Sequence, residues 1–201
     1  MYRSESRIGA TCAIAGSVLL FVGIYLHPLE ADPNEAVAAF REYAADQLWV
    51  ASHVVQLAGV VLIVAALLCL AQQLEAASGS GGSRIAAGGA IASLAVTAVL
   101  QAVDGIALKV MVEAWAAAPA SQKEAAFHAA FAVRRVEIGL ASTLSVLFGL
   151  TVTVYGVALL VDHTYPKWMG GLAIMGGVPT VVAGVVMAYT GFINCRRVLS
   201  F

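Results

Sequence analysis

Charged residues are scarce in this chain: they make up 11% of its 201 residues, whereas hydrophobic residues make up 61%. Soluble domains average roughly 25% charged residues. A soluble core of this size cannot hide so large an apolar surplus, which therefore needs lipid as a second apolar solvent. The composition predicts a membrane protein.

Three further absences exclude particular kinds of binding site or cross-link. The chain has no basic block and a net charge of −1, which argues against nucleic-acid binding. Its three cysteines, Cys12, Cys69 and Cys195, lie in or beside apolar runs without metal-ligand spacing, so they are expected to be packing residues rather than a disulfide framework. The run Gly79–Gly82 lacks the Lys and Ser/Thr that a phosphate-binding loop places after its last glycine.

Long, uninterrupted apolar runs are what the chain does have. Only helices and closed barrels satisfy their backbone groups in lipid, and barrel strands alternate apolar and polar residues, which these runs do not. The sequence therefore predicts an all-α, polytopic transmembrane helix bundle that forms a single membrane domain over residues 1–201. About five spans are expected, at residues 8–26, 48–70, 85–112, 137–161 and 169–192.

The segments between the spans also carry signals. A short amphipathic helix is predicted between the first two spans, because Val37, Phe40 and Tyr43 recur at helical spacing. Residues 78–83 are typical of a flexible linker, and residues 115–122 of a loop. Residues 123–161 have helical character throughout. At ~1.5 Å per residue they would extend for about 58 Å, so their first part is expected to project beyond the membrane or to break.

Basic residues give a weak orientation signal. Arg3, Arg7 and Arg84 favour a cytoplasmic N-terminus in a multipass protein of the cell membrane. With five spans, Arg196 and Arg197 would then lie on the outer side, against the same rule.

Polar side chains gather at one depth of the predicted bundle, toward its outer side. The candidate ligand-binding residues in this layer are His53, Gln56, Gln101, Asp104, Arg134 and Glu137. Asp104 lies roughly 12 Å inside an apolar run by helix rise. A carboxylate at that depth needs a partner, which we expect to be Arg134 or Arg135. Arg134 and Glu137 are also spaced for an i, i+3 ion pair.

Histidines from three predicted helices share this depth. His27, His53 and His128, together with Asp104, would supply three nitrogens and one oxygen to a metal such as zinc. A bis-histidine haem on His27 and His53 is a second alternative. No two of these histidines have a local ligand spacing, so the sequence predicts no cofactor outright.

Four segments resemble a family of bacterial multipass membrane proteins with no assigned activity. They are Leu26-His27-Pro28, Trp49-x3-His53-x2-Gln56-x2-Gly59, Val103-Asp104-Gly105-x-Ala107-Leu108-Lys109 and Ala132-Val133-Arg134-x2-Glu137. Members of this family often carry six spans, whereas this chain shows five. The resemblance implies a fold and no mechanism.

Three functions stay open at this level. The first is a polar pocket that binds a small ligand, a lipid headgroup or an ion. The second is a membrane-embedded zinc-dependent hydrolase, which the absence of any local catalytic signature disfavours. The third is a structural or assembly subunit of a membrane complex. The expected partners are membrane lipid and a small molecule.

Overall fold

The computed structural model describes residues 2–28, 30–78 and 81–192. Within these ranges the chain is all-α and contains no strand, as predicted. The described residues form five helices that are long and apolar enough to cross a membrane: Ser6–Leu26, Trp49–Ala77, Gly81–Ala117, Lys123–Val161 and Lys167–Thr190. The prediction of a multipass helical bundle is confirmed.

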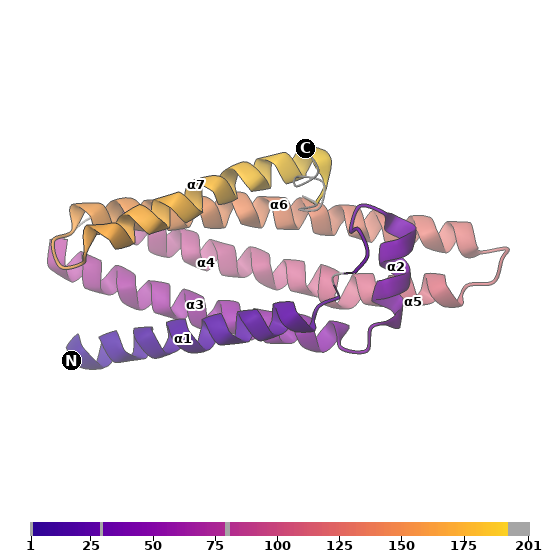
Figure 1. Ribbon diagram of the computed structural model, residues 1–201, viewed down its shortest axis with the longest axis horizontal. Helices are drawn as coiled ribbons and strands as arrows, with labels where there is room; N and C mark the ends of the chain where they lie inside the picture. Colours follow the sequence, from indigo (N-terminus) through magenta and orange to yellow (C-terminus); the bar gives the residue numbers. More distant parts are fainter. Residues whose placement is uncertain (1, 29, 79–80, 193–201) are drawn as a thin grey trace.

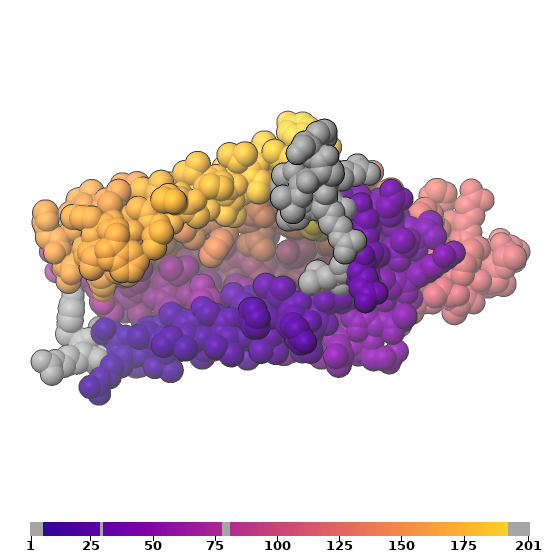
Figure 2. Space-filling model, viewed as in Figure 1, coloured from indigo at the N-terminus to yellow at the C-terminus, as the bar shows by residue number. Residues whose placement is uncertain are grey.

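The long helices run side by side along the long axis of the molecule (Figure 1). In chain order the helices are α1 (Tyr2–Leu26), α2 (Ala36–Ala45), α3 (Trp49–Ser78), α4 (Gly81–Ala102), the π-helix η1 (Val103–Leu108), α5 (Lys109–Ala117), α6 (Lys123–Val161) and α7 (Lys167–Thr190). The spans form a row in which α1 packs on α3, α3 on α4, α4 on α6 and α6 on α7. Figure 2 shows a hollow between α1 and α7 along one face of this row.

Glycines allow the two outer pairs of the row to approach closely. A Cβ added at Gly16 of α1 would lie 2.8 Å from the carbonyl oxygen of Gly59 in α3. A Cβ at Gly149 of α6 would lie 2.7 Å from the carbonyl oxygen of Gly177 in α7. Lipid is as apolar as the helix surfaces, so the hydrophobic effect does not drive membrane helices together. Small residues at these positions let the helices approach closely and associate through van der Waals packing.

One end of the molecule carries a small cap, which consists of α2, α5 and the part of α6 that precedes Arg134. In Figure 1, α5 and the start of α6 extend beyond the other helices, and α2 crosses them. The Phe40 ring of α2 packs against Trp115 and Phe127, with ring centroids 5.9 and 5.7 Å away. Lys109 Nζ donates hydrogen bonds to the carbonyl oxygens of Tyr43, Ala44 and Asp46 at 2.7–3.0 Å, which satisfies the end of α2.

Several local predictions can now be compared with the structure. The amphipathic helix is present as α2; Phe40 and Tyr43 are buried, but Val37 is exposed. Residues 123–161 form one unbroken helix.

The prediction of a flexible linker over residues 78–83 was wrong for its second half. Helix α4 begins at Gly81, and Ser83 is buried. Helix α5 continues to Ala117, which shortens the predicted loop.

Two cysteines, Cys12 and Cys69, are half-buried and free within the described residues. The Cβ of Cys69 would lie 3.0 Å from a Cβ added at Gly9, so Cys69 packs between α3 and α1 as expected. Cys195, Arg196 and Arg197 lie outside the described residues.

Candidate functional site

Asp104 lies in η1, the π-helical turn that joins α4 to α5. A π-helix closes its hydrogen bonds over five residues instead of four and changes the side-chain register of the helix. Here the Asp104 side chain lies against α3. The indole Nε1 of Trp49 donates a hydrogen bond to the Asp104 carbonyl oxygen at 3.0 Å, which ties η1 to the start of α3.

His53 and Asp104 form the central pair of the site. The Nε2 atom of His53 lies 3.0 Å from Oδ2 of Asp104, and His53 is 3% exposed. The Nδ1 atom of His53 lies 2.6 Å from the Trp49 carbonyl oxygen, which can only accept a hydrogen bond, so Nδ1 carries a proton. In a neutral imidazole, Nε2 then presents its lone pair to a carboxylate oxygen. Two acceptors this close need a cation between them, either a proton or a metal.

His27 follows α1 directly, where Pro28 ends the helix. Its Nδ1 atom lies 2.9 Å from the Pro28 carbonyl oxygen, which assigns the proton to Nδ1 and leaves Nε2 unprotonated. Burial lowers the pKa of His27 below its usual 6.5, because desolvation penalises the imidazolium. The ring is therefore neutral at neutral pH, as metal binding requires.

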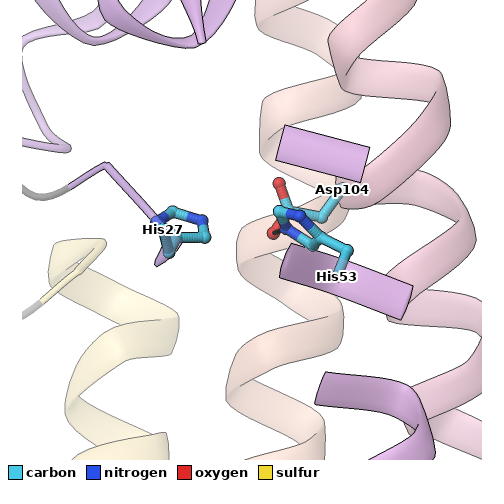
Figure 3. A group of neighbouring side chains, drawn as sticks. All are labelled: His27, His53 and Asp104. Carbon is cyan, nitrogen blue, oxygen red and sulfur yellow. Dashed lines mark hydrogen bonds and ion pairs between the residues drawn. The ribbon is translucent and has the colours of Figure 1, made fainter. Parts of the chain in front are cut away.

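His27, His53 and Asp104 come together from three separate segments (Figure 3). Among the described residues they form a cluster in which one ligand atom from each side chain lies within 4.8 Å of the others. The His27 and His53 ring centroids are 5.1 Å apart. Three of the four predicted metal ligands therefore meet at one point.

His128 does not join this cluster, which corrects the predicted four-residue shell. Its side chain is 69% exposed on α6, with Nε2 3.9 Å from Glu124 Oε1. The continuous α6 helix carries His128 into the cap, almost two turns before Arg134. The predicted depth of His128 in the bundle is similar to that of His53, but the His128 side chain is exposed instead of facing the bundle interior.

Arg134 and Glu137 form a second buried pair. Nη1 of Arg134 lies 2.5 Å from Oε2 of Glu137, and both side chains are at most 6% exposed. Nη2 of Arg134 also donates to the Pro33 carbonyl oxygen at 3.2 Å and to the Tyr43 hydroxyl at 3.1 Å. Burial raises the pKa of Tyr43 to about 12.

The expected pairing of Asp104 with an arginine was wrong. Asp104 pairs with His53, because the i, i+3 spacing on α6 gives Arg134 the nearer carboxylate of Glu137. Arg135 is exposed, and its guanidinium lies over the Phe131 ring at 5.0 Å from the centroid.

A cavity of about 250 Å³ joins the two pairs beneath the cap. Its lining includes His27, Tyr43, Asp104, Arg134, Glu137 and Phe192. The Oδ1 atom of Asp104 is buried and has no hydrogen-bond partner among the described residues. His27 and Asp104 of the cluster and the Arg134–Glu137 ion pair therefore line the same cavity.

The two predicted glutamines lie elsewhere. Nε2 of Gln56 donates to the Gly23 carbonyl oxygen at 3.3 Å, so Gln56 ties α3 to α1 instead of lining the cavity. Gln101 lines a separate, mostly apolar groove beside His53. Its Oε1 atom is buried and has no partner among the described residues.

Two contributors to the site were not predicted from the sequence. Tyr43 was assigned only to the amphipathic helix, and nothing in its local sequence indicates that it meets Arg134. The role of the Trp49 carbonyl does have a local signal, because Trp49 and His53 are four residues apart on α3 and one turn of helix brings them into contact.

Comparisons of the chain with protein-family models, curated proteins and solved structures find no match.

Proposed function

We propose that this multipass membrane protein binds a divalent transition-metal ion, with zinc as the first candidate, between His27, His53 and Asp104. The observation that carries the proposal is the approach of the His53 Nε2 atom to the Asp104 Oδ2 atom at 3.0 Å, with a second imidazole, that of His27, beside them. A metal ion satisfies all three side chains at once.

The donor set and its surroundings support zinc. Imidazole nitrogen and carboxylate oxygen are ordinary zinc ligands. Zinc-bound histidines usually donate their other N–H to a carbonyl or carboxylate, which fixes the ring. His53 does so to Trp49, and His27 to Pro28. Zinc–nitrogen bonds of about 2.0–2.1 Å imply ligand separations near 3.4 Å, so metal binding should move His53 Nε2 and Asp104 Oδ2, now 3.0 Å from each other, slightly apart.

Three protein ligands leave a fourth coordination position open. That is the usual arrangement of catalytic zinc, whereas structural zinc sites have four protein ligands. A haem fits less well, because ring centroids 5.1 Å apart leave no room for a macrocycle between them.

The site lies at the cap end of the bundle. With the N-terminus in the cytoplasm, as Arg3, Arg7 and Arg84 favour, the cap and the metal would face the outer side of the cell membrane.

The test is a metal titration of the purified protein in detergent, followed by elemental analysis. We expect one zinc or cobalt ion per chain, and a loss of at least tenfold in affinity for His53→Ala and for Asp104→Asn. His128→Ala is the matched control, since it removes an exposed histidine of the same protein, and should bind like the wild type.

Two outcomes would contradict the proposal. One is a wild-type protein that takes up no stoichiometric metal. The other is an Asp104→Asn variant that purifies as folded protein and binds zinc with unchanged affinity. A metal-free protein whose Asp104→Asn variant only loses stability would indicate that the pair fixes helix order, as in a structural subunit.

A further inference from the structure

The cavity beneath the cap is lined by both polar and apolar residues. The polar ones are His27, Tyr43, Asp104, Arg134 and Glu137, and the apolar ones are Pro28, Ala31, Pro33 and Phe192. Its volume of about 250 Å³ has room for a small organic molecule, since about 10–15 Å³ is enough to hold one water. Two of the three proposed metal ligands line this cavity, so an ion that they hold can be reached from it.

Tyr43 offers a hydrogen-bond donor in this cavity. The Nη2 atom of Arg134 donates to the Tyr43 hydroxyl at 3.1 Å, and a guanidinium has no acceptor, so the hydroxyl oxygen accepts this bond. The hydroxyl proton then has no acceptor among the described residues, although Tyr43 is only 4% exposed. A buried donor without a partner costs free energy. An acceptor oxygen on a molecule in the cavity would satisfy it.

This donor lies close to the metal cluster. The ring centroids of Tyr43 and His27 are 6.5 Å apart, and Arg134 Cζ lies 5.3 Å from the Tyr43 centroid. Tyr43 also packs on Trp49, with centroids 4.4 Å apart, and the Trp49 carbonyl oxygen orients His53. One small molecule can therefore contact both the metal and the Tyr43 hydroxyl.

Charge indicates which kind of molecule fits. A divalent ion held by two neutral imidazoles and the Asp104 carboxylate keeps one net positive charge. The charges of Arg134 and Glu137 offset each other, because the two side chains form an ion pair. A monoanion would neutralise the remaining charge, whereas a dianion such as sulfate would exceed it. A carboxylate carries one negative charge and two acceptor oxygens, one for the metal and one for a donor.

From these observations we infer that the cavity binds a small monocarboxylate. Its carboxylate bridges the metal and the Tyr43 hydroxyl, and its short hydrocarbon part lies against Ala31 and Phe192, which supply apolar lining. The inference rests on the proposed metal site and names the class of ligand that the site takes.

The test is a titration of the cobalt-loaded protein in detergent with butyrate. Butyrate should change the visible spectrum of the bound cobalt, and sulfate at equal ionic strength should not. Tyr43→Phe should weaken butyrate binding about fivefold, since it removes one neutral hydrogen bond, and should bind cobalt like the wild type. Tyr25→Phe is the matched control, because Tyr25 is 79% exposed, and should bind butyrate normally.

A second pair of variants tests the cavity and leaves Tyr43 in place. Ala31→Leu adds bulk to the lining and should weaken butyrate binding about tenfold. Ala38→Leu adds the same bulk at an exposed position of α2 and should have no effect.

The metal site and the carboxylate site can fail separately. A protein that takes up no cobalt would contradict the proposed function and this inference with it. A protein that binds cobalt but shows no spectral change with saturating butyrate would overturn this inference alone. Sulfate binding as tight as that of butyrate, or wild-type butyrate affinity in both Tyr43→Phe and Ala31→Leu, would also overturn it.

Discussion

Gly105 of η1 contacts His53 of α3 so closely that a Cβ on Gly105 would lie 2.7 Å from the Cβ of His53. Real Cβ atoms essentially never approach that closely. The missing side chain lets the π-helical turn lie directly on His53, and the neighbouring Asp104 reaches Nε2 from the same turn. The geometry of the pair therefore depends on a residue that contributes no ligand atom.

Gly105→Ala should weaken metal binding without removing any ligand. The added methyl group must displace His53 or η1, and disturbing the support of a metal ligand typically costs about 10–100-fold in affinity. Zinc titration in detergent measures the effect. Gly88→Ala is the control, because a Cβ there meets nothing within 4 Å. Equal affinity in both variants would show that the close contact does not position His53.

Arg134→Met should destabilise the fold strongly. It leaves the buried Glu137 carboxylate without its partner, a change that typically costs roughly 3–5 kcal/mol. The double variant Arg134→Met/Glu137→Met removes both charges and should recover most of that loss. Thermal unfolding in detergent compares the two variants. A double variant no more stable than the single one would argue that the pair contributes through its other hydrogen bonds, to Pro33 and Tyr43.

Lys109→Met should loosen α2 and leave the spans intact. Lys109 is buried and donates to three carbonyl oxygens at the end of α2, and each hydrogen bond to a charged group contributes about 1.5–3 kcal/mol. Hydrogen exchange should rise in residues 36–46. Lys123→Met removes a comparable set of bonds, to Trp115 and Ala116. The Lys123→Met variant should affect only the tip of the cap. Faster hydrogen exchange of α2 in both variants would contradict the conclusion that Lys109 holds the end of α2.

Stability should fall above about pH 10, and part of this fall belongs to Tyr43. Burial raises the pKa of Tyr43 to about 12, whereas an unfolded tyrosine ionises near pH 10. Between these values the unfolded chain releases a proton that the folded protein keeps, so the free energy of unfolding decreases with rising pH. The loss is on the order of 2 kcal/mol by pH 12. Tyr43→Phe should lack this part of the slope in unfolding measurements.

Tyr25→Phe is the control for this pH dependence, since Tyr25 is 79% exposed. It should keep the wild-type slope. If Tyr43→Phe also keeps the full slope, another group is responsible for the alkaline loss of stability.

The fold class and the spans follow from the amino-acid sequence alone. Long apolar runs in a chain with 11% charged residues leave few alternatives to a bundle of membrane-spanning helices, because the backbone groups of a segment in lipid must find their hydrogen-bond partners within the protein. Helix α2 was also predictable from the spacing of Phe40 and Tyr43. The sequence placed His27, His53 and Asp104 at one depth, because helix rise converts position along a span directly into depth.

Which of these residues come into contact depends on how the helices pack against one another. Depth does not fix the rotation of a helix, so His128 and His53 look alike in the sequence, although one is exposed on α6 and the other is buried against η1. The π-helical register that brings Asp104 to His53, and the pairing of Arg134 with Glu137, depend on how neighbouring helices pack. That packing is set by contacts such as that of Gly105 with His53, between residues distant in the chain, which no local spacing encodes.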